Sequence, residues 1–216
     1  MNANVHTEAV VLQGPTPHGD LSVPTHALGV VLFAHGSGSS RLSSRNRWVA
    51  SQLQRRGLAT LLFDLLTEDE SLDRRMVFDI PLLAQRVANA MRWAEQVEEL
   101  ADLRLGLFGA STGAAAALVA AAKKPQQVAA VVSRGGRPDL AWDTLPLVRA
   151  PTLLIVGGQD EEVLELNRQA LRQLGCSKRL EVVPGATHLF EEPGALDSVA
   201  ALAADWFEQH LNHGRQ

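Results

Sequence analysis

Residue types that could carry out nucleophilic catalysis lie in three separate segments of the sequence. Ser111 is at the centre of the pentapeptide 109–113 (Gly-Ala-Ser-Thr-Gly), between an apolar run that ends at Phe108 and a helix predicted from Thr112. A serine at a sharp strand-to-helix turn has its Oγ raised above the sheet edge, and the turn needs small residues two positions before and after it. Both are glycine here. The pentapeptide alone is also compatible with an ordinary glycine-rich turn.

Two further candidates follow later apolar runs. Asp160 comes after the run 152–156, and His188 comes after a run that ends at Val183. Taken singly, Asp160 could be the N-cap of the next helix and His188 a surface histidine. The order serine, aspartate, histidine, each after a successive strand, favours a catalytic triad instead. In that triad Ser111 is the nucleophile, His188 the base and Asp160 the acid that orients it.

A loop rich in glycine and serine, 35–40 (His-Gly-Ser-Gly-Ser-Ser), follows the apolar run 29–34. A loop at this place can supply one backbone N–H of an oxyanion hole, and the N–H of Thr112 supplies the other. Ser37 is the first choice for the loop donor, with Gly38 or Ser39 as alternatives. Gly36 and Gly38 are expected to bring the backbone close to the substrate. His35 is expected to order the loop rather than to transfer protons.

Short apolar runs alternate with longer amphipathic segments along the chain, which predicts strands followed by helices. Strands are predicted at 10–12, 21–23, 29–34, 59–63, 103–108, 128–133, 152–156 and 180–183, and helices at 47–56, 79 to about 100, 112–124, 162–174 and 195–211. The acidic stretch 67–75 is predicted as a polar connection. The pattern predicts one α/β domain over 1–216, with a mostly parallel sheet covered by helices on both faces. Ligand sites of such sheets lie at the carboxyl ends of the strands.

Composition restricts the classes of partner. The chain has 216 residues, a net charge of −4 and a pI near 6.0, with its basic residues spread along the sequence, which argues against nucleic acid. No apolar run is long enough to span a bilayer, and residues 1–7 lack the features of a signal peptide. A single cysteine, Cys176, excludes an intramolecular disulfide and suits a reducing compartment. We therefore expect a cytoplasmic monomer or homodimer that does not bind membranes.

These motifs resemble the α/β-hydrolase superfamily over essentially the whole chain, and the small size looks most like its dienelactone hydrolase-like branch. The resemblance implies an α/β-hydrolase fold with an eight-stranded sheet whose second strand is antiparallel, and a triad of Ser111, Asp160 and His188. It implies hydrolysis of a small-molecule ester through an acyl-enzyme, with no metal and no organic cofactor. True dienelactone hydrolases use cysteine as nucleophile, so the serine at position 111 favours simple carboxylic esters over dienelactone.

About 17 residues separate the strand that ends near Ser133 from Pro151, where larger relatives of this fold insert a cap domain. So short a segment predicts a loop with at most one helical turn and an open site without a cap. Arg134, within the stretch 133–139, is expected to line part of this site. Arg41, Arg45 and Arg134 could attract an anionic substrate, but solvated side chains or ion pairs with the acidic segment 67–73 are favoured.

Several alternatives remain open. A dinucleotide-binding protein is suggested by Gly36, Gly38 and Asp64 after successive strands, but Arg41 stands where a third small residue is needed. A non-catalytic binding module of the same fold is a second alternative. Within the hydrolases, thioesterase, amidase, peptidase or acyltransferase activity would use the same triad.

Overall fold

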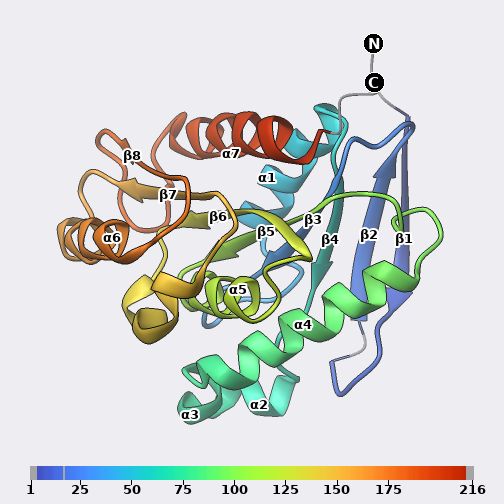
Figure 1. Cartoon of the computed structure of the whole chain (residues 1–216), viewed down its shortest axis with the longest axis horizontal. Helices are drawn as coiled ribbons and strands as arrows, with labels where there is room; N and C mark the ends of the chain where they lie inside the picture. The colour runs from blue at the N-terminus through green and yellow to red at the C-terminus, as the bar shows by residue number, and fades with distance from the viewer. Residues whose placement is uncertain (1–3, 17, 213–216) are drawn as a thin grey trace.

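The computed structural model describes residues 4–16 and 18–212 of the chain. Its eight strands form one sheet in the order β1-β2-β4-β3-β5-β6-β7-β8 (Figure 1). Strand β2 is antiparallel to both of its neighbours, and the remaining neighbouring pairs are parallel. The strands are β1 (Val5–Val11), β2 (His18–Pro24), β3 (Val30–Ala34), β4 (Ala59–Phe63), β5 (Leu105–Ala110), β6 (Val128–Arg134), β7 (Thr152–Gly157) and β8 (Lys178–Val183). The predicted sheet, with its antiparallel second strand, is confirmed.

Helices cover both faces of this sheet. Helices α1 and α7 lie against each other on one face, whereas α4 and α5 pack on the opposite face, with the segment η1 beside α5 (Figure 1). The helical segments are α1 (Ser44–Arg55), α2 (Glu68–Leu72), α3 (Arg74–Val77), α4 (Ile80–Gln96), α5 (Thr112–Lys123), η1 (Pro138–Leu147), α6 (Glu161–Gln173) and α7 (Ala195–Leu211). The molecule is therefore a three-layer α/β structure, as the alternation of strands and helices predicted.

The central strands are buried on both faces, which explains their continuous apolar sequences. All five residues of β3 and all six of β5 are buried. Because successive side chains of a strand point to opposite faces, Phe33 packs toward α1 and α7, and Leu32 packs toward α4 and α5. The rings of Phe33 and Phe108, on neighbouring strands, have centroids 4.8 Å apart. This packing fixes the carboxyl ends of β3 and β5, where the catalytic candidates lie.

Several boundaries differ from the prediction for local reasons. Helix α1 begins at Ser44 rather than at residue 47, because the Ser43 side chain accepts a hydrogen bond from the Asn46 N–H and caps the helix. Helix α4 begins directly after Asp79, whose side chain caps it, but ends at Gln96 instead of near residue 100. Strands β1 and β2 are longer than predicted, because they pair with each other along their whole length.

The acidic segment 67–75, predicted only as a connection, forms the short helices α2 and α3. Helix α2 begins with a capping box: the Glu70 N–H donates to the Thr67 hydroxyl, and the Thr67 N–H donates to the Glu70 carboxylate. This reciprocal pair satisfies two backbone donors that would otherwise lack partners. Helix α2 is important for the site because it forms one wall of the cavity described below.

The connection between β6 and β7 is compact. It contains the segment η1, in which two short helical pieces are separated by a kink at Ala141, where the sequence predicted at most one helical turn. Segment η1 packs against α5 and α6 and does not form a separate domain over the sheet. The fold described for residues 4–16 and 18–212 therefore has no cap domain. No helix in these same residues combines the length and the apolar character needed to cross a bilayer.

Candidate active site

Ser111 occupies the turn between β5 and α5 in a backbone conformation that L-residues rarely adopt. Its φ is 50° and its ψ is −121°, whereas six of the other eight positive-φ positions among the described residues are glycines. Such a conformation costs on the order of 1–3 kcal/mol and is found mainly where function requires it. The turn is held by backbone bonds, because the Ser111 N–H donates to Arg134 O (3.3 Å) and the Ala114 N–H donates to Ser111 O (3.1 Å). The predicted sharp turn is therefore present.

The two glycines that flank this turn are required by close packing. A Cβ atom at Gly109 would lie 2.7 Å from the backbone nitrogen of Ala114, and a Cβ at Gly113 would lie 2.7 Å from the carbonyl carbon of Ala34. Both contacts are with backbone atoms, which cannot rotate away. The absence of side chains lets the start of α5 lie directly against β3 and β5. This explains in physical terms why the sequence has small residues two positions on either side of Ser111.

Asp160 and His188 form a direct hydrogen bond. The His188 Nδ1 lies 2.6 Å from the Asp160 Oδ2, with His188 38% and Asp160 15% exposed. Asp160 stands at the N-cap position of α6, but its side chain makes no capping hydrogen bond. The carboxylate is therefore turned toward His188 and away from the helix. A carboxylate on Nδ1 favours the tautomer that carries its proton there, which leaves Nε2 free to accept a proton.

The loops that carry this pair are joined by backbone contacts. The Gln159 N–H donates to Ala186 O at 2.9 Å, and the Gly158 N–H donates to Val183 O at 2.9 Å. A Cβ at Gly157 would lie 2.6 Å from the carbonyl oxygen of Thr187, so this glycine permits the close approach of the two loops. The β7–α6 and β8–α7 loops thus form one unit that fixes the distance between Asp160 and His188.

Ser111 and His188 both adjoin the end of β6. Gly135, with φ +50°, lies against His188, since a Cβ there would be 3.5 Å from His188 Nδ1. The preceding residue, Arg134, accepts the backbone hydrogen bond of Ser111. Within the described residues, no hydrogen bond joins the side chains of Ser111 and His188. Catalytic hydrogen bonds are often long or misaligned before substrate binds and tighten in the complex.

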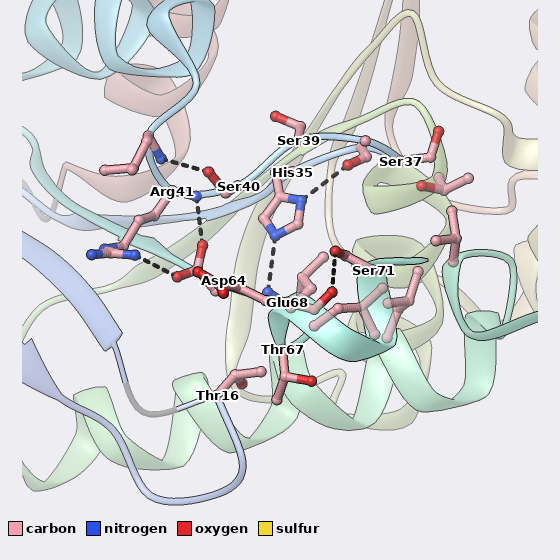
Figure 2. Close-up of a pocket in the computed structure, with 18 of the residues that line it drawn as sticks. Thr16, His35, Ser37, Ser39, Ser40, Arg41, Asp64, Thr67, Glu68 and Ser71 are labelled. Atoms are coloured by element: carbon pink, nitrogen blue, oxygen red, sulfur yellow. Dashed lines mark hydrogen bonds and ion pairs between the residues drawn. The ribbon is translucent and has the colours of Figure 1, made fainter. Parts of the chain in front are cut away.

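The expected oxyanion loop lies beside Ser111. A Cβ at Gly36 would be 3.0 Å from the Ser111 Cβ, which shows how closely the two segments approach. Gly36, Ser37, Gly38 and Thr112 line one cavity of about 370 Å³, shown in Figure 2. The structure thus brings the four predicted loop and helix residues to one wall of a single cavity. Which backbone N–H in this loop acts with that of Thr112 remains a prediction.

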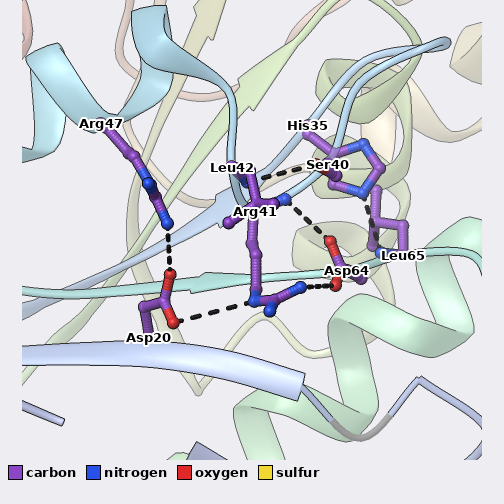
Figure 3. Close-up of polar contacts among 8 residues, drawn as sticks. All are labelled: Asp20, His35, Ser40, Arg41, Leu42, Arg47, Asp64 and Leu65. Atoms are coloured by element: carbon purple, nitrogen blue, oxygen red, sulfur yellow. Dashed lines mark hydrogen bonds and ion pairs between the residues drawn. The ribbon is translucent and has the colours of Figure 1, made fainter. Parts of the chain in front are cut away.

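His35 ties this loop to the next strand. The Leu65 N–H donates to His35 Nε2 at 2.9 Å (Figure 3). This leaves the proton on Nδ1, from where it is donated to Gly36 O at 3.0 Å. Burial lowers the pKa of His35, more than its bond to Gly36 and the nearby Asp64 carboxylate raise it. His35 is therefore a neutral residue with both ring nitrogens engaged. This agrees with its predicted role in ordering the loop.

The arginines expected near the site differ in their partners. Arg41 forms a 2.7 Å ion pair with Asp64, and Arg45 pairs with Glu191 at 3.0 Å. Both arginines thus form ion pairs, as predicted. The predicted partners were wrong, because Asp64 and Glu191 lie outside the acidic segment 67–73. They come from chain segments that are distant in sequence, which a local charge pattern does not reveal.

Arg134 is buried without an ion-pair partner. It is 8% exposed, and its Nε and Nη1 atoms lack any hydrogen-bond partner. Burial, and secondarily the charge of Arg45, lowers the pKa of Arg134 to about 10. Arg134 does not line the cavity beside the loop 35–40. Its backbone oxygen accepts the Ser111 N–H, whereas its side chain is not part of the lining that includes Gly36 and Gly38.

Two features of the site were not predicted from the sequence. The cavity is closed on its far side by the β1–β2 connection and by α2, including Thr16, Thr67 and Ser71. The Thr67–Glu70 spacing is a sequence signal for a capping box and could have located α2. The second feature is the hydroxyl of Thr112, which has no hydrogen-bond partner on a residue only 2% exposed.

Among the described residues, no group of three or more His, Cys, Asp or Glu side chains has the arrangement of a metal site.

The chain is similar to solved hydrolases along almost its whole length. A dienelactone hydrolase from Anabaena variabilis is 54% identical, with a TM-score of 0.92 over 98% of this chain and 100% of that chain. A cold-adapted esterase from an Arctic intertidal metagenomic library has a TM-score of 0.76 at 21% identity, over 98% of this chain and 96% of that chain. The second similarity shows a shared fold.

A curated relative from Mycobacterium tuberculosis, found in two strains, is 59% identical over 205 residues. Its name assigns it provisionally to the phosphoribosyl transferases. The match covers 94% of this chain and 46% of that protein, so the chain spans about half the length of the curated relatives it matches. The model of the dienelactone hydrolase family matches residues 19–213. The chain therefore belongs to the dienelactone hydrolase family, and its fold is the α/β-hydrolase fold.

Proposed function

We propose that the protein is a serine hydrolase that cleaves small carboxylic esters, with Ser111 as nucleophile, His188 as base and Asp160 as the residue that orients His188. The observation that carries this proposal is the backbone of Ser111, whose φ of 50° and ψ of −121° keep the serine at a sharp turn above β5. A strained serine at this position costs stability and is retained mainly where its hydroxyl has a function. The 2.6 Å bond between His188 and Asp160 supports the same assignment.

The proposed reaction has two acyl-transfer steps. His188 Nε2 accepts the proton of Ser111 Oγ as the oxygen attacks the ester carbonyl carbon, and Asp160 stabilises the imidazolium that forms. The carbonyl oxygen gains the negative charge and is bound by backbone N–H groups of Thr112 and of the Ser37 loop. The intermediate collapses, and His188 gives its proton to the leaving alcohol oxygen. Water then attacks the acyl-enzyme by the reverse route and releases the acid.

Labelling with a fluorophosphonate probe tests this function directly. We expect Ser111 to carry the adduct, which peptide mass spectrometry would locate, and we expect hydrolysis of a p-nitrophenyl ester. Ser111→Ala should lose both the adduct and the turnover, whereas Ser198→Ala, on the exposed side of α7, should retain both. Folded protein that remains unlabelled at Ser111 would contradict the assignment and favour a non-catalytic binding module.

The name of the Mycobacterium tuberculosis relatives gives a second candidate, phosphoribosyl transfer. That name belongs to proteins about twice the length of this chain, since the match covers 46% of them. Incubation of this chain with a phosphoribosyl donor and acceptor tests whether the activity resides in the matched part. The sharp turn that holds Ser111 supports acyl transfer. Thioesters and amides are also cleaved by acyl transfer, so they should be assayed with the esters.

We also propose, from charge and composition, that the partner is a small molecule rather than nucleic acid or a membrane. The chain carries a net charge of −4. A cytoplasmic monomer or homodimer remains our expectation for its location and assembly.

A further inference from the structure

We infer that the cavity beside the oxyanion loop binds the acyl part of the ester and selects an uncharged acyl group that carries hydroxyls, such as a polyhydroxy acid. This inference rests on the proposed function. The cavity has a volume of about 370 Å³, within the range of small-molecule sites. It is lined by the oxyanion loop, the β1–β2 connection, the start of α2 and Thr112 (Figure 2).

The position of His188 assigns the cavity to the acyl group. His188 must protonate the leaving oxygen, so the alcohol side of the ester faces the histidine. His188 and Asp160 do not line the cavity, whereas Gly36, Ser37 and Thr112 do. A carbonyl oxygen held by the backbone of this loop and of Thr112 therefore directs its other substituent, the acyl chain, into the cavity.

The charged groups of the lining neutralise one another. Arg41 donates from its backbone N–H and from Nη1 to the two carboxylate oxygens of Asp64, at 2.8 and 2.7 Å. Its Nε also lies 3.7 Å from Asp20, which in turn pairs with Arg47 at 3.0 Å (Figure 3). Glu68 adds an exposed carboxylate to the lining. Arg41 is therefore already engaged by carboxylates of the protein, and a carboxylate on the acyl chain would be repelled by Glu68.

The hydroxyl groups of the lining are only partly satisfied. Thr67 Oγ1 accepts the Glu70 N–H and Ser40 Oγ accepts the Leu42 N–H, so the proton of each hydroxyl is free to be donated. Ser71 Oγ donates to Glu68 O at 2.6 Å, which leaves its lone pairs free to accept. The cavity thus offers donors and acceptors together. An alcohol, which donates and accepts, matches this mixture better than a carboxylate or an alkyl chain does.

The unpaired hydroxyl of Thr112 is a second observation, independent of the other lining hydroxyls, that points to a bound ligand. Its Oγ1 is buried and has no partner, on a residue 2% exposed that lines the cavity next to the nucleophile. A buried hydroxyl without a hydrogen bond is costly and calls for a specific partner. The floor of the cavity is apolar, with Leu65, Val77 and Leu83 buried. A hydroxylated carbon chain can contact this floor through its CH groups and bond Thr112 through an oxygen.

Matched ethyl esters test this selectivity. Ethyl 3,4-dihydroxybutanoate and ethyl 3-methylpentanoate have acyl groups of the same shape, with two hydroxyls in one where the other has methyl groups. After correction for their rates of alkaline hydrolysis, we expect kcat/KM to favour the dihydroxy ester about 10-fold or more. Monoethyl succinate, whose acyl chain ends in a carboxylate, should be the poorest of the three.

Variants locate the selectivity in the cavity. Thr112→Val replaces the hydroxyl by a methyl group and should lower the ratio of the two kcat/KM values at least about 3-fold, the effect of one lost hydrogen bond. Thr152→Val is the matched control, because Thr152 is equally buried but lies in β7, outside the cavity. Its ratio should stay at the wild-type value. The ratio cancels any loss of folded or active protein.

The outcomes separate this inference from the proposed function. Hydrolysis of both neutral esters with a ratio of one or less would overturn the hydroxyl selectivity and leave the serine hydrolase intact. A high ratio that Thr112→Val leaves unchanged, or a preference for monoethyl succinate, would also overturn it. Absence of hydrolysis of all three esters, together with no fluorophosphonate adduct on Ser111, would overturn the proposed function and this inference with it.

Discussion

Asp160 holds the position from which an aspartate normally caps a helix, but its carboxylate binds His188 at 2.6 Å and makes no bond to the backbone of α6. The two roles require different orientations of the side chain. A capping bond typically stabilises a protein by about 1 kcal/mol. The side chain instead lies where it can fix the tautomer of a histidine. This arrangement gives the pair a functional meaning that can be tested separately from its contribution to stability.

Asp160→Asn should lower kcat by on the order of 10³–10⁴-fold, because an amide cannot hold the His188 tautomer or stabilise its imidazolium. The free energy of unfolding should fall by less than about 1 kcal/mol, since the amide can still form a hydrogen bond with His188 and the charge that is lost lies near a helix N-terminus. Asp79→Ala is the opposite case, because Asp79 accepts the Leu82 N–H at 3.0 Å and caps α4. It should cost about 1 kcal/mol and leave kcat near wild type. Steady-state kinetics and urea unfolding of both variants measure this contrast.

If Asp160→Asn instead unfolds as easily as Asp79→Ala and keeps its turnover, Asp160 is a structural residue. The candidate triad would then lack its acid.

Ser111→Gly should be more stable than Ser111→Ala by about 1 kcal/mol, although neither variant should hydrolyse esters. The reason is the φ of 50° at this position, which strains any residue with a Cβ and suits glycine. The gain is smaller than the full strain, because glycine also increases the entropy of the unfolded chain. Urea unfolding of the two variants under identical conditions measures the difference. Equal stability would mean that the surrounding turn has relaxed and stores no strain.

His35 should make the protein less stable in mild acid. Burial lowers its pKa in the folded state below the ordinary value of 6.5, so well above pH 6.5 the residue is neutral in both states and its contribution to stability is fully present. As the pH falls from 6.5 toward the lowered folded pKa, the unfolded chain binds a proton that the folded chain rejects. Stability is then lost at up to about 1.4 kcal/mol per pH unit.

The measurement is urea unfolding at several pH values between 7.5 and 5, for wild type and for His35→Gln. The glutamine side chain can still accept the Leu65 N–H but does not titrate. The wild type should therefore lose more stability than His35→Gln over this range. Parallel curves would show that other groups, such as the partly buried His210, cause the acid sensitivity.

The sequence allowed the fold to be predicted because its strongest signals are local. Strand β3 is a continuous apolar run that is buried on both faces, and α4 carries its own start signal in Asp79 and Pro81. Ser111, Asp160 and His188 could be found because parallel strands bring their carboxyl ends to one edge. The role of Asp160 could not be decided in the same way, since capping and binding His188 differ only in the direction of one side chain.

The parts of the site that the sequence did not reveal depend on distant segments. Arg41 pairs with Asp64 and Asp20, both more than 20 residues away, rather than with the acidic residues of 67–73. The far wall of the cavity comes from α2 and from the β1–β2 connection, which no local pattern links to Ser111. Burial of Arg134 without a partner is likewise a property of the packed molecule.

Arg134 is the most unusual charge in the structure. Its guanidinium is buried with two nitrogens unpaired, and the neighbouring charge of Arg45 is of the same sign. By contrast, Arg86 is equally buried but bonds Glu70 at 2.9 Å. An isolated buried cation lowers stability, whereas a paired one is costly to remove. Arg134→Met should therefore raise the free energy of unfolding by about 1 kcal/mol, and Arg86→Met should lower it by about 2 kcal/mol.

A buried cation that lowers stability can be retained for a function, and Arg134 is predicted from the sequence to bind substrate. It adjoins Gly135, which contacts His188, so an anion bound by Arg134 would belong to the alcohol side of the ester. Arg134→Met should therefore reduce kcat/KM about 10-fold or more for 3-(butyryloxy)propanoate, and much less for its uncharged amide. If the variant is more stable and hydrolyses both esters like wild type, Arg134 does not bind substrate. Its burial would then serve neither stability nor ester hydrolysis.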